Sequence, residues 1–194
     1  LDYAALSQLT PGHFPRLKSL FLSGEEDLFS HISDVIDIVA AFTGLETLGM
    51  DGFGLTDAEF ATLYASAIEG RIGDFYGLAL WHNDLTASSV ELISNITSLE
   101  WLNIGANPVS DISALTTLPN LRDLGIKETG VADLQQLRDM YDAGAFRPES
   151  EAEIDLNNNG LDLTTGTENR GVVDFLVSAG VDVKWEDGNV TDTQ

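Results

Sequence analysis

Apolar residues recur along this chain in a fixed pattern, which is clearest between residues 99 and 137. The first copy places Leu99, Leu102, Ile104 and Val109 around a polar Asn107. The same offsets return 22 residues later, counted from Leu99 to Leu121, in a second copy: Leu121, Leu124, Ile126, Thr129 and Val131. Side chains two residues apart share one face of a strand. Each copy therefore predicts a short strand with two inward apolar residues, followed by a turn at the Asn position.

Copies of this pattern can be recognised at six places, and the intervals between them vary. They start at Leu17, Leu45, Phe75, Leu99, Leu121 and Glu151, so the intervals are 28, 30, 24, 22 and 30 residues. In the first copy, Glu25 occupies the Asn position. A single coil of this kind cannot bury its own apolar face, so neighbouring coils have to stack. We therefore expect a row of parallel strands, with the variable lengths accommodated on the opposite side.

The segments between the predicted strands are mostly typical of helices, because their apolar residues recur at helical spacing. We expect helices over about residues 28–42, 58–69, 87–94 and 133–143. Thr56, with Glu59 three residues later, and Thr86 should cap two of them, and Gly70 should end the second. After Val109 the chain has room only for a compact turn with one helical turn.

The two copies between Leu99 and Val131, in the form LxxLxLxxNxL, resemble the leucine-rich repeats of bacterial proteins, internalins in particular. The longer helical segments near Leu28 and Ala58 are similar to ribonuclease-inhibitor-like repeats. The resemblance implies an α/β fold, a right-handed solenoid with a parallel strand stack on its concave face and helices or short turns on its convex face.

Within such a solenoid we expect three regions. A short helix carrying Tyr3, Leu6 and Leu9 lies in an N-terminal cap over residues 1–16, and about six repeats follow over residues 17–165. Residues 166–194 form a C-terminal cap and polar tail, in which residues 171–185 give a helix and then a last coil or cap. The end of this tail, residues 186–194, should be frayed.

Composition narrows the function classes. The chain has 194 residues, of which 32 are acidic and 9 basic, giving a net charge of −23. Such a charge argues against nucleic acid and anionic membrane surfaces as partners. There is no cysteine, which excludes disulfides, thiolate zinc sites and cysteine nucleophiles. No apolar run is long enough to insert into a membrane. Because the chain begins at Leu1, we expect a processed or trimmed form.

The residues beside each inward pair should be exposed on the concave face. This geometry places Tyr76, Trp81, His82 and Trp101 on adjacent coils, and it places Phe21 and Asn103 together in one outward column of the sheet. Small neighbouring residues leave room for the aromatic rings: Gly77, Ala79, Gly105 and Ala106. Exposed aromatic residues with a polar tip are typical of protein-binding hot spots. We therefore predict a ligand-binding surface at these six residues. The alternative is that a flanking loop covers the rings or that they pack on each other.

A weaker pattern suggests a calcium loop. Asp155, Asn157, Asn159 and Gly160 satisfy the opening D-x-[DN]-x-[DN]-G of such a loop. The twelfth position, which should hold a bidentate acid, is Gly166. We favour the alternative, in which Asn159 continues the ladder of turn asparagines, and we predict no metal and no cofactor.

We predict no catalytic residues and no enzymatic activity. The histidines His13, His31 and His82 are scattered, and the chain has no GxSxG motif, P-loop or dinucleotide fingerprint. The hypothesis is therefore a noncatalytic module that recognises a protein or glycan as a monomer, in a secreted or cell-surface bacterial protein. A structural spacer in a larger extracellular protein, stabilised by calcium, is the alternative function, and the cytoplasm is the alternative location.

Overall fold

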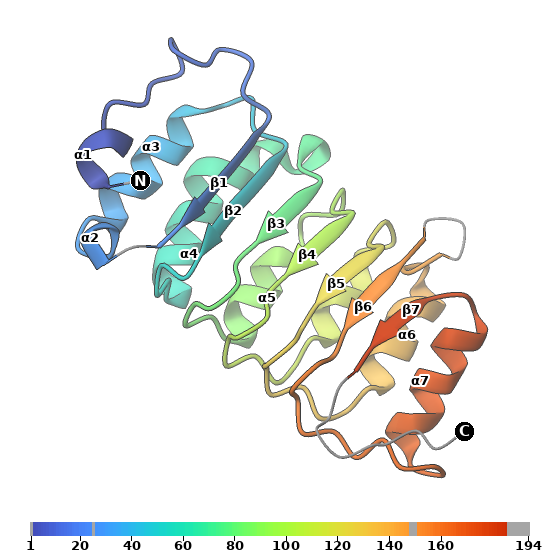
Figure 1. Cartoon of the computed structure of the whole chain (residues 1–194). Helices are drawn as coiled ribbons and strands as arrows, with labels where there is room; N and C mark the ends of the chain where they lie inside the picture. Colours follow the sequence, from blue (N-terminus) through green and yellow to red (C-terminus); the bar gives the residue numbers. More distant parts are fainter. Residues whose placement is uncertain (1, 25, 148–150, 186–194) are drawn as a thin grey trace.

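The computed structural model describes residues 2–24, 26–147 and 151–185. Within these residues, seven parallel strands form one open sheet whose order follows the sequence (Figure 1). The strands are β1 (Ser19–Ser23), β2 (Thr47–Asp51), β3 (Gly77–Ala79), β4 (Trp101–Asn103), β5 (Asp123–Gly125), β6 (Glu153–Asp155) and β7 (Asp182–Lys184). The predicted stack of parallel strands is confirmed. Strand β7 extends the stack and lies in the segment that was predicted to form a last coil or cap.

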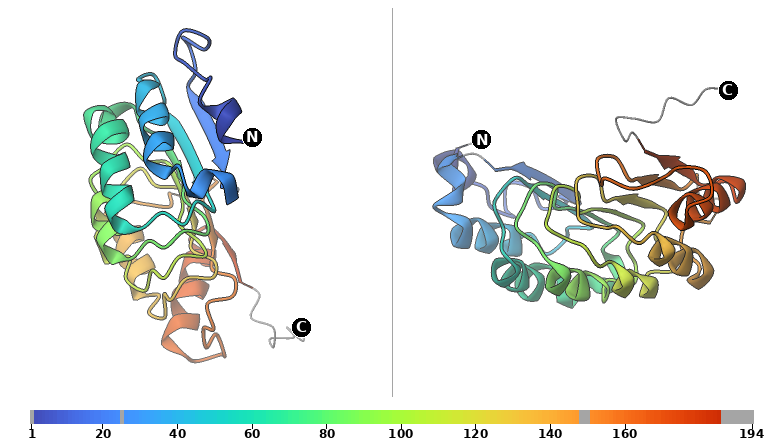
Figure 2. Two further views of the ribbon diagram at one scale, coloured as in Figure 1. Left: turned by 90° about the vertical axis from the view of Figure 1, so that its left-hand side faces the viewer. Right: turned by 90° about the horizontal axis from the view of Figure 1, so that it is seen from below.

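The helices are α1 (Tyr3–Leu6), α2 (Glu26–Phe29), α3 (Ile32–Ala41), α4 (Asp57–Leu63), α5 (Ala87–Ile93), α6 (Gln135–Ala143) and α7 (Glu168–Ser178), with a short 3-10 turn at Ser113–Thr117. From α3 onward they lie together on one side of the sheet, whereas α1 and α2 lie beside β1 at the end of the sheet (Figure 1). Figure 2 shows a shallow arc, with the strands along its concave side and the helices along its convex side. Because the convex segments differ in length while β3 to β7 each have three residues, the concave side stays regular.

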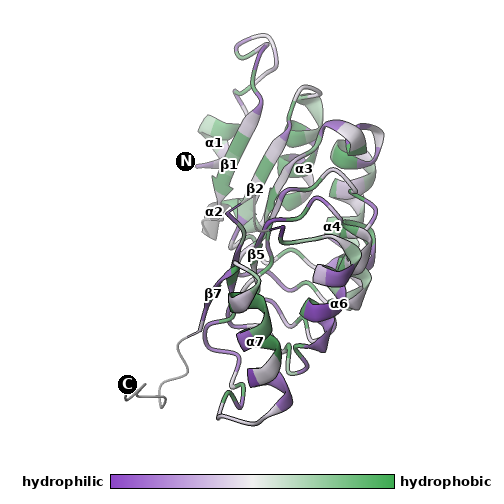
Figure 3. Cartoon of the chain, turned by 90° about the vertical axis from the view of Figure 1, so that its right-hand side faces the viewer, coloured by the Kyte–Doolittle hydropathy of each residue, from purple (hydrophilic) through white to green (hydrophobic). Residues whose placement is uncertain are grey.

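The core lies between the sheet and the helices, where the inward residues of successive strands stack. Along the middle of the sheet, Leu48, Leu78, Leu102, Leu124 and Ile154 are each 2% exposed or less. The hydrophobic colouring of Figure 3 follows α3, whereas α6 is largely hydrophilic. Amphipathic helices such as α6 bury only one stripe, which here contains Leu137 and Met140. No helix in the described part of the chain is both long and apolar enough to cross a membrane.

The caps predicted for two convex helices are confirmed. Thr56 accepts a hydrogen bond from the backbone N–H of Glu59, and the Glu59 carboxylate accepts one from the N–H of Thr56, which completes a capping box. The Thr86 hydroxyl accepts a bond from the N–H of Ser88 at the start of α5. These bonds satisfy amide groups that the first turn of a helix leaves without intrahelical partners.

Two helix predictions on the convex side were wrong in extent. The helix expected over residues 28–42 is divided into α2 and α3, and His31 between them has non-helical backbone angles. Its ring stacks on Tyr3 with centroids 3.9 Å apart, and the Tyr3 hydroxyl donates to Asp34 at 2.9 Å. Contacts with the N-terminal helix thus accompany the break between α2 and α3. The apolar spacing of residues 28–42 does not predict these contacts.

The other difference concerns the segment after α4, which does not end at Gly70. It continues as a π-helix (Tyr64–Ile68) and a 3-10 helix (Glu69–Asp74). The guanidinium of Arg71 donates to the carbonyl oxygen of Phe42 at 2.9 Å, which ties this segment to the preceding coil. The helix predicted near Tyr3 ends at Leu6, before Leu9. The expectations for Glu25 and for residues 186–194 fall outside the described residues.

Candidate functional site

Two columns of side chains cross all seven strands of the concave face, and the parallel register aligns them from strand to strand. The first column runs through Ser19, Thr47, Gly77, Trp101, Asp123, Glu153 and Asp182. The second runs through Phe21, Gly49, Ala79, Asn103, Gly125, Asp155 and Lys184. This is the register that the repeat pattern predicts, because a fixed offset from each inward leucine reaches the same place on every coil. Aromatic residues lie toward β1 to β4, and carboxylates lie toward β5 to β7.

Phe21 and Trp101 form a stacked pair on this face. Their ring centroids are 6.1 Å apart and their planes differ by 11°. Each ring leans over a glycine, since a Cβ added at Gly49 would overlap Phe21 and one added at Gly77 would overlap Trp101. Phe21 remains 58% exposed, and Trp101 is half-buried. Part of the alternative considered for these rings therefore holds, because they pack on each other, yet the pair still presents apolar surface.

Trp81 occupies a separate place just after β3. Its ring lies over Gly105, where an added Cβ would overlap it, and the Lys127 ammonium lies 5.7 Å from its centroid. The backbone N–H of Trp81 donates to the Asp51 carboxylate at 2.9 Å. Burial raises the pKa of Asp51, against the lowering effect of this hydrogen bond. Trp81 is thus held by a hydrogen bond from its backbone to Asp51 and by the packing of its ring over Gly105.

The remaining three predicted residues are placed differently. Tyr76 precedes β3 and is 38% exposed. His82 is exposed in a turn with a positive φ of 55°, a conformation uncommon for residues other than glycine. Asn103 is half-buried in β4, and its side-chain oxygen accepts a bond from the N–H of Gly105 at 3.0 Å. The structure therefore brings Phe21 and Trp101 into contact, while Tyr76, Trp81, His82 and Asn103 lie in or beside β3 and β4.

Sequence reasoning did not select Asp123 of β5 or Glu153 of β6 as candidates, and it considered Asp155 only as part of the calcium loop. Asp123, Glu153 and Asp155 share a hollow of about 220 Å³ with Trp101 and Asn103, floored by Leu102, Leu124 and Gly125. Glu153 pairs with Lys184 at 2.5 Å. The signal that could have found this group was present, since the register aligns these columns with the aromatic residues.

Buried asparagines connect neighbouring coils behind the face. The Asn83 amide oxygen accepts bonds from the backbone N–H groups of Phe53 and Leu55, both at 3.0 Å. Its amide nitrogen donates to the carbonyl oxygens of Met50 and Leu80 at 2.9 and 3.0 Å. A buried polar side chain is tolerated when its hydrogen bonds are made, and here one side chain joins two coils.

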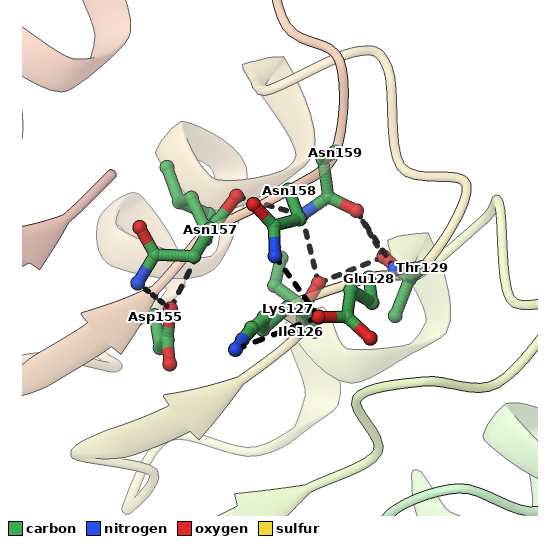
Figure 4. Close-up of polar contacts among 9 residues, drawn as sticks. Ile126, Lys127, Glu128, Thr129, Asp155, Asn157, Asn158 and Asn159 are labelled. Carbon is green, nitrogen blue, oxygen red and sulfur yellow. Dashed lines mark hydrogen bonds and ion pairs between the residues drawn. The ribbon is translucent and has the colours of Figure 1, made fainter. Parts of the chain in front are cut away.

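The loop that suggested a calcium site uses Asn159 in a similar way (Figure 4). The Asn159 oxygen accepts bonds from the backbone N–H and the hydroxyl of Thr129 at 2.8 and 2.9 Å. Its nitrogen donates to the carbonyl oxygens of Ile126 and Leu156 at 2.8 and 2.9 Å. Asn159 therefore bonds as the ladder interpretation predicts, and its oxygen is directed toward the preceding coil.

The other oxygens of this loop point elsewhere. Asp155 accepts bonds from the N–H and side-chain nitrogen of Asn157 at 3.0 and 2.7 Å, and Asn158 donates to Glu128 at 2.9 Å (Figure 4). Within the described residues, no group of three or more His, Cys, Asp or Glu side chains is arranged to hold a metal ion. The chemistry that the site offers is thus aromatic stacking and charge.

Comparison with known proteins identifies the fold. No family model and no curated protein sequence matches the chain. Among solved structures, internalin C2 of Listeria monocytogenes aligns over 95% of this chain and 66% of its own, with 20% identity and a TM-score of 0.57. The internalin InlF of the same organism aligns over 97% of this chain and 60% of its own, with 21% identity and a TM-score of 0.53.

A third similar structure is the C-terminal domain of tropomodulin from Caenorhabditis elegans. It aligns over 74% of this chain and 91% of its own, with 14% identity and a TM-score of 0.55. The chain thus spans less than two thirds of either internalin. At these identities the likeness concerns the fold, which is that of a leucine-rich-repeat solenoid.

Proposed function

We propose that this leucine-rich-repeat chain is a noncatalytic recognition module that binds a protein partner on its concave face, around Phe21, Trp101 and Trp81. The observation that supports this most is the Phe21–Trp101 pair, in which a ring that is 58% exposed lies on a half-buried one. Aromatic side chains contribute large contact areas and dominate interface hot spots, with tryptophan and tyrosine enriched there. An exposed aromatic pair on a solenoid face can therefore anchor a partner.

Rigidity strengthens the proposal. Gly49 and Gly77 leave the space into which the two rings lean, and the rings pack there against the backbone, since side chains at those positions would collide with them. Gly105 similarly leaves space for the Trp81 ring, and the Lys127 ammonium lies 5.7 Å from the centroid of that ring. Binding costs free energy for every side chain that must be ordered, and preordered side chains reduce that cost. The face thus combines apolar surface with little freedom to lose.

A glycan is the second ligand class, because sugar rings can also lie on exposed aromatic rings. A spacer role would need no ligand at all. We also propose a secreted or cell-surface location and a monomeric state, on the grounds of the acidic composition and the lack of cysteine. The proposal assigns no catalytic role to His13, His31 or His82, which belong to separate parts of the chain.

The experiment is selection of binding peptides from a random display library on the immobilised chain. Recovered peptides and a glycan array are then tested on a Phe21→Ala/Trp101→Ala variant. We expect peptide affinity to fall about 30-fold, the equivalent of a hot spot worth about 2 kcal/mol. Circular dichroism melting establishes that the variant is folded.

The matched control is Val177→Ser, which removes exposed apolar surface from the convex helix α7. Peptides that bind the concave face should bind this variant as they bind the parent chain. Peptides that bind the double variant unchanged would overturn the proposed site. Recovery of glycans alone would overturn the choice of a protein partner, and recovery of nothing would favour the spacer.

A further inference from the structure

Strand β1 forms one end of the sheet and has a single neighbouring strand. Within the described residues it pairs with β2 alone, because it comes first in the strand order. Just before β1, the Lys18 carbonyl oxygen accepts a bond from the N–H of Glu46 at 2.7 Å. Just after it, the Gly24 N–H donates to the Asp51 carbonyl oxygen, also at 2.7 Å. Lys18 and Gly24 therefore direct these backbone groups to the coil of β2.

The backbone groups of alternate residues in β1 point away from β2. A strand directs the N–H and C=O groups of successive residues to its two sides in turn, so Lys18 and Gly24 fix the direction for the even-numbered residues. The odd-numbered residues Ser19, Phe21 and Ser23 direct theirs to the open side. Helices α1 and α2 lie beside this end of the sheet (Figure 1), but no backbone hydrogen bond joins either helix to β1 in the described part of the chain. The open side of β1 thus offers a row of backbone groups to another strand.

The sequence of β1 lacks the features that normally protect an edge strand from pairing. Its five residues are Ser-Leu-Phe-Leu-Ser, with no charged residue and no proline. The opposite end of the sheet differs, because β7 has three residues and carries Asp182 and Lys184, both exposed. Short length, charged side chains and proline are means by which edge strands avoid pairing with other chains. The sheet is therefore protected at β7 and open to pairing at β1.

The packing of Leu20 is also incomplete at this end. Leu20 points into the core from β1 and is only half-buried. The residues aligned with it on the next four strands are 2% exposed or less: Leu48, Leu78, Leu102 and Leu124. On the concave side, the Phe21 ring leans over Gly49, toward β2 and away from the open edge. A strand beside β1 could therefore pack on Leu20 without colliding with the Phe21 ring.

The charge near the start of β1 differs from that of the whole chain. Residues 1–23 contain two basic residues, Arg16 and Lys18, and one acidic residue, whereas the chain has a net charge of −23. Lys18 is paired with Glu46 at 2.5 Å, and Arg16 is exposed. The sequence after the strand is acidic at residues 25–27, so the attraction for an anion is confined to the start of β1. A partner segment that carries an acidic residue at this end would be complementary.

We infer that an extended segment of the protein partner adds to the sheet as a further strand beside β1, with an acidic residue next to Arg16. This inference rests on the proposed function and names the way in which the partner's backbone is bound. An extended segment supplies N–H and C=O groups at the spacing of Ser19, Phe21 and Ser23, and main-chain hydrogen bonds give such strand additions their affinity. One apolar residue of the segment would pack on Leu20. The residues on either side of it would lie beside Phe21, which connects this edge to the proposed aromatic anchor.

The test follows amide hydrogen exchange of the full chain by nuclear magnetic resonance. The probes are acetyl-Glu-Val-Thr-Val-Thr-Val-amide and the same sequence reversed, so that the acidic residue can reach the start of β1 in either strand direction. In the free chain, the amides of Ser19, Phe21 and Ser23 should exchange faster than those of Leu20 and Leu22, which bond to β2. A bound probe should slow exchange of the first three several-fold and leave the other two unchanged. Absence of this alternation with both probes would overturn the inference.

Methylated probes distinguish strand pairing from docking of side chains. One isomer carries N-methyl groups on its valine amides and the other on its threonine amides, so each blocks the hydrogen bonds of one edge of the peptide. Only one of the two isomers should lose binding, because only one edge of an added strand faces β1. Loss of binding in both isomers, or in neither, would overturn the inference.

Variants of the chain make the test specific to the edge. Ser19→Pro removes an outward N–H at the first residue of β1, where proline is tolerated, and should weaken probe binding roughly five-fold. Ser19→Ala keeps the N–H and is the matched control, so it should bind as the parent chain does. Arg16→Gln should weaken binding roughly two- to five-fold, and by less in added salt. Equal affinities of Ser19→Pro and Ser19→Ala would overturn the inference, and the methylated probes test it on the unaltered chain if Ser19→Pro does not fold.

These outcomes are distinguishable from failure of the proposed function. If display peptides require Phe21 and Trp101 but bind Ser19→Pro as they bind the parent chain, then the aromatic anchor stands and the inferred strand is wrong. If the probes give the alternating exchange and no display peptide depends on the rings, then the strand site exists and the proposed anchor is wrong. Slowed exchange at the same amides without a probe, increasing with chain concentration, would show a second copy at the edge and overturn the choice of a partner protein.

Discussion

The Phe21 and Trp101 rings lie 6.1 Å apart although two other strands separate β1 from β4. Neighbouring strands are about 4.8 Å apart, so three steps across the sheet cover roughly 14 Å. The rings meet because Phe21 leans across Gly49 and Trp101 leans across Gly77. Two glycines in the columns between them therefore make the contact possible, and the aromatic pair depends on positions that carry no side chain.

Substitution Gly77→Ala should destabilise the chain and displace Trp101. The new Cβ would overlap the indole ring, and such overpacking typically costs about 1–3 kcal/mol. Thermal unfolding should show a lower Tm, and acrylamide should quench tryptophan fluorescence more readily. The matched control is Gly171→Ala in helix α7, where an added Cβ meets nothing within 4 Å. That control should be neutral or slightly stabilising, and an unchanged Tm in Gly77→Ala would contradict the packing described here.

Loss of the Asn83 side chain should be among the most damaging single changes. Asn83→Ala leaves the buried N–H groups of Phe53 and Leu55 without the acceptor that both now use. Each unsatisfied buried group costs about 1–3 kcal/mol, so the free energy of unfolding measured with denaturant should fall by at least about 2 kcal/mol. Asn120→Ala is the control, because its exposed side chain donates to one carbonyl oxygen, that of Thr97. Equal losses in the two variants would argue against a coil-joining role for Asn83.

Asp57 should stabilise the chain at neutral pH by joining α4 to the start of α5. Its carboxylate accepts bonds from the Thr86 N–H at 2.9 Å, the Thr86 hydroxyl at 2.6 Å and the Ser89 hydroxyl at 2.5 Å. Burial alone would raise the pKa of Asp57, but these hydrogen bonds outweigh it and lower the pKa below its usual value. Because the folded state thus prefers the charged form, the contribution is complete above the unfolded pKa of about 3.9 and is lost as the pH falls through the lower folded pKa.

The measurement is the stability of Asp57→Ala relative to the parent chain as a function of pH. At pH 7 the variant should lose about 1–3 kcal/mol of unfolding free energy, and the difference should shrink below about pH 4. Asp37→Ala, on the exposed side of α3, should show little loss at either pH. A difference for Asp57→Ala that stays constant down to pH 2 would exclude the charged carboxylate as its source.

Asp51 should behave in the opposite sense. Its pKa is raised by burial, with the N–H of Trp81 as a partial compensation, so the folded chain disfavours the charged form. The penalty is present above the folded pKa and disappears as the pH falls below the unfolded one. Asp51→Asn, which keeps an acceptor for Trp81, should raise Tm at pH 7 by about 1–3 °C. Asp51→Ala also removes that acceptor and should lower Tm, so a rise in both variants would refute a role for the hydrogen bond.

The strand positions could be predicted from the sequence because the repeat ties them to a short-range pattern. Leu102 and Ile104 are two residues apart, and this spacing alone places Trp101 and Asn103 on the opposite face of β4. The columns of the concave face followed directly, and the structure has the same register on every coil. The capping box at Thr56 and Glu59 is also local, and it was predicted for the same reason.

Features that depend on contacts between distant residues could not be predicted in this way. The break before α3 involves Tyr3, which lies far from His31 in sequence and stacks on it in the fold. The direction in which Trp101 leans depends on Gly77 from the preceding coil, and the acidic hollow depends on which side chains surround it. A periodic pattern gives the position of a Cα on the sheet, whereas a side chain's rotamer is decided by neighbours that the period does not contain.

The parallel strands of this sheet set a constant spacing between neighbouring coils along the concave face. Every coil adds one step of about 4.8 Å, whatever the length of the segment that returns behind it, and the intervals between successive copies of the repeat differ by up to eight residues, from 22 to 30. Residues gained or lost behind the sheet would therefore leave the spacing between Phe21, Trp101 and Asp155 unaltered. The convex surface of such a chain can therefore change in length during evolution while the spacing of side chains on the concave surface stays the same.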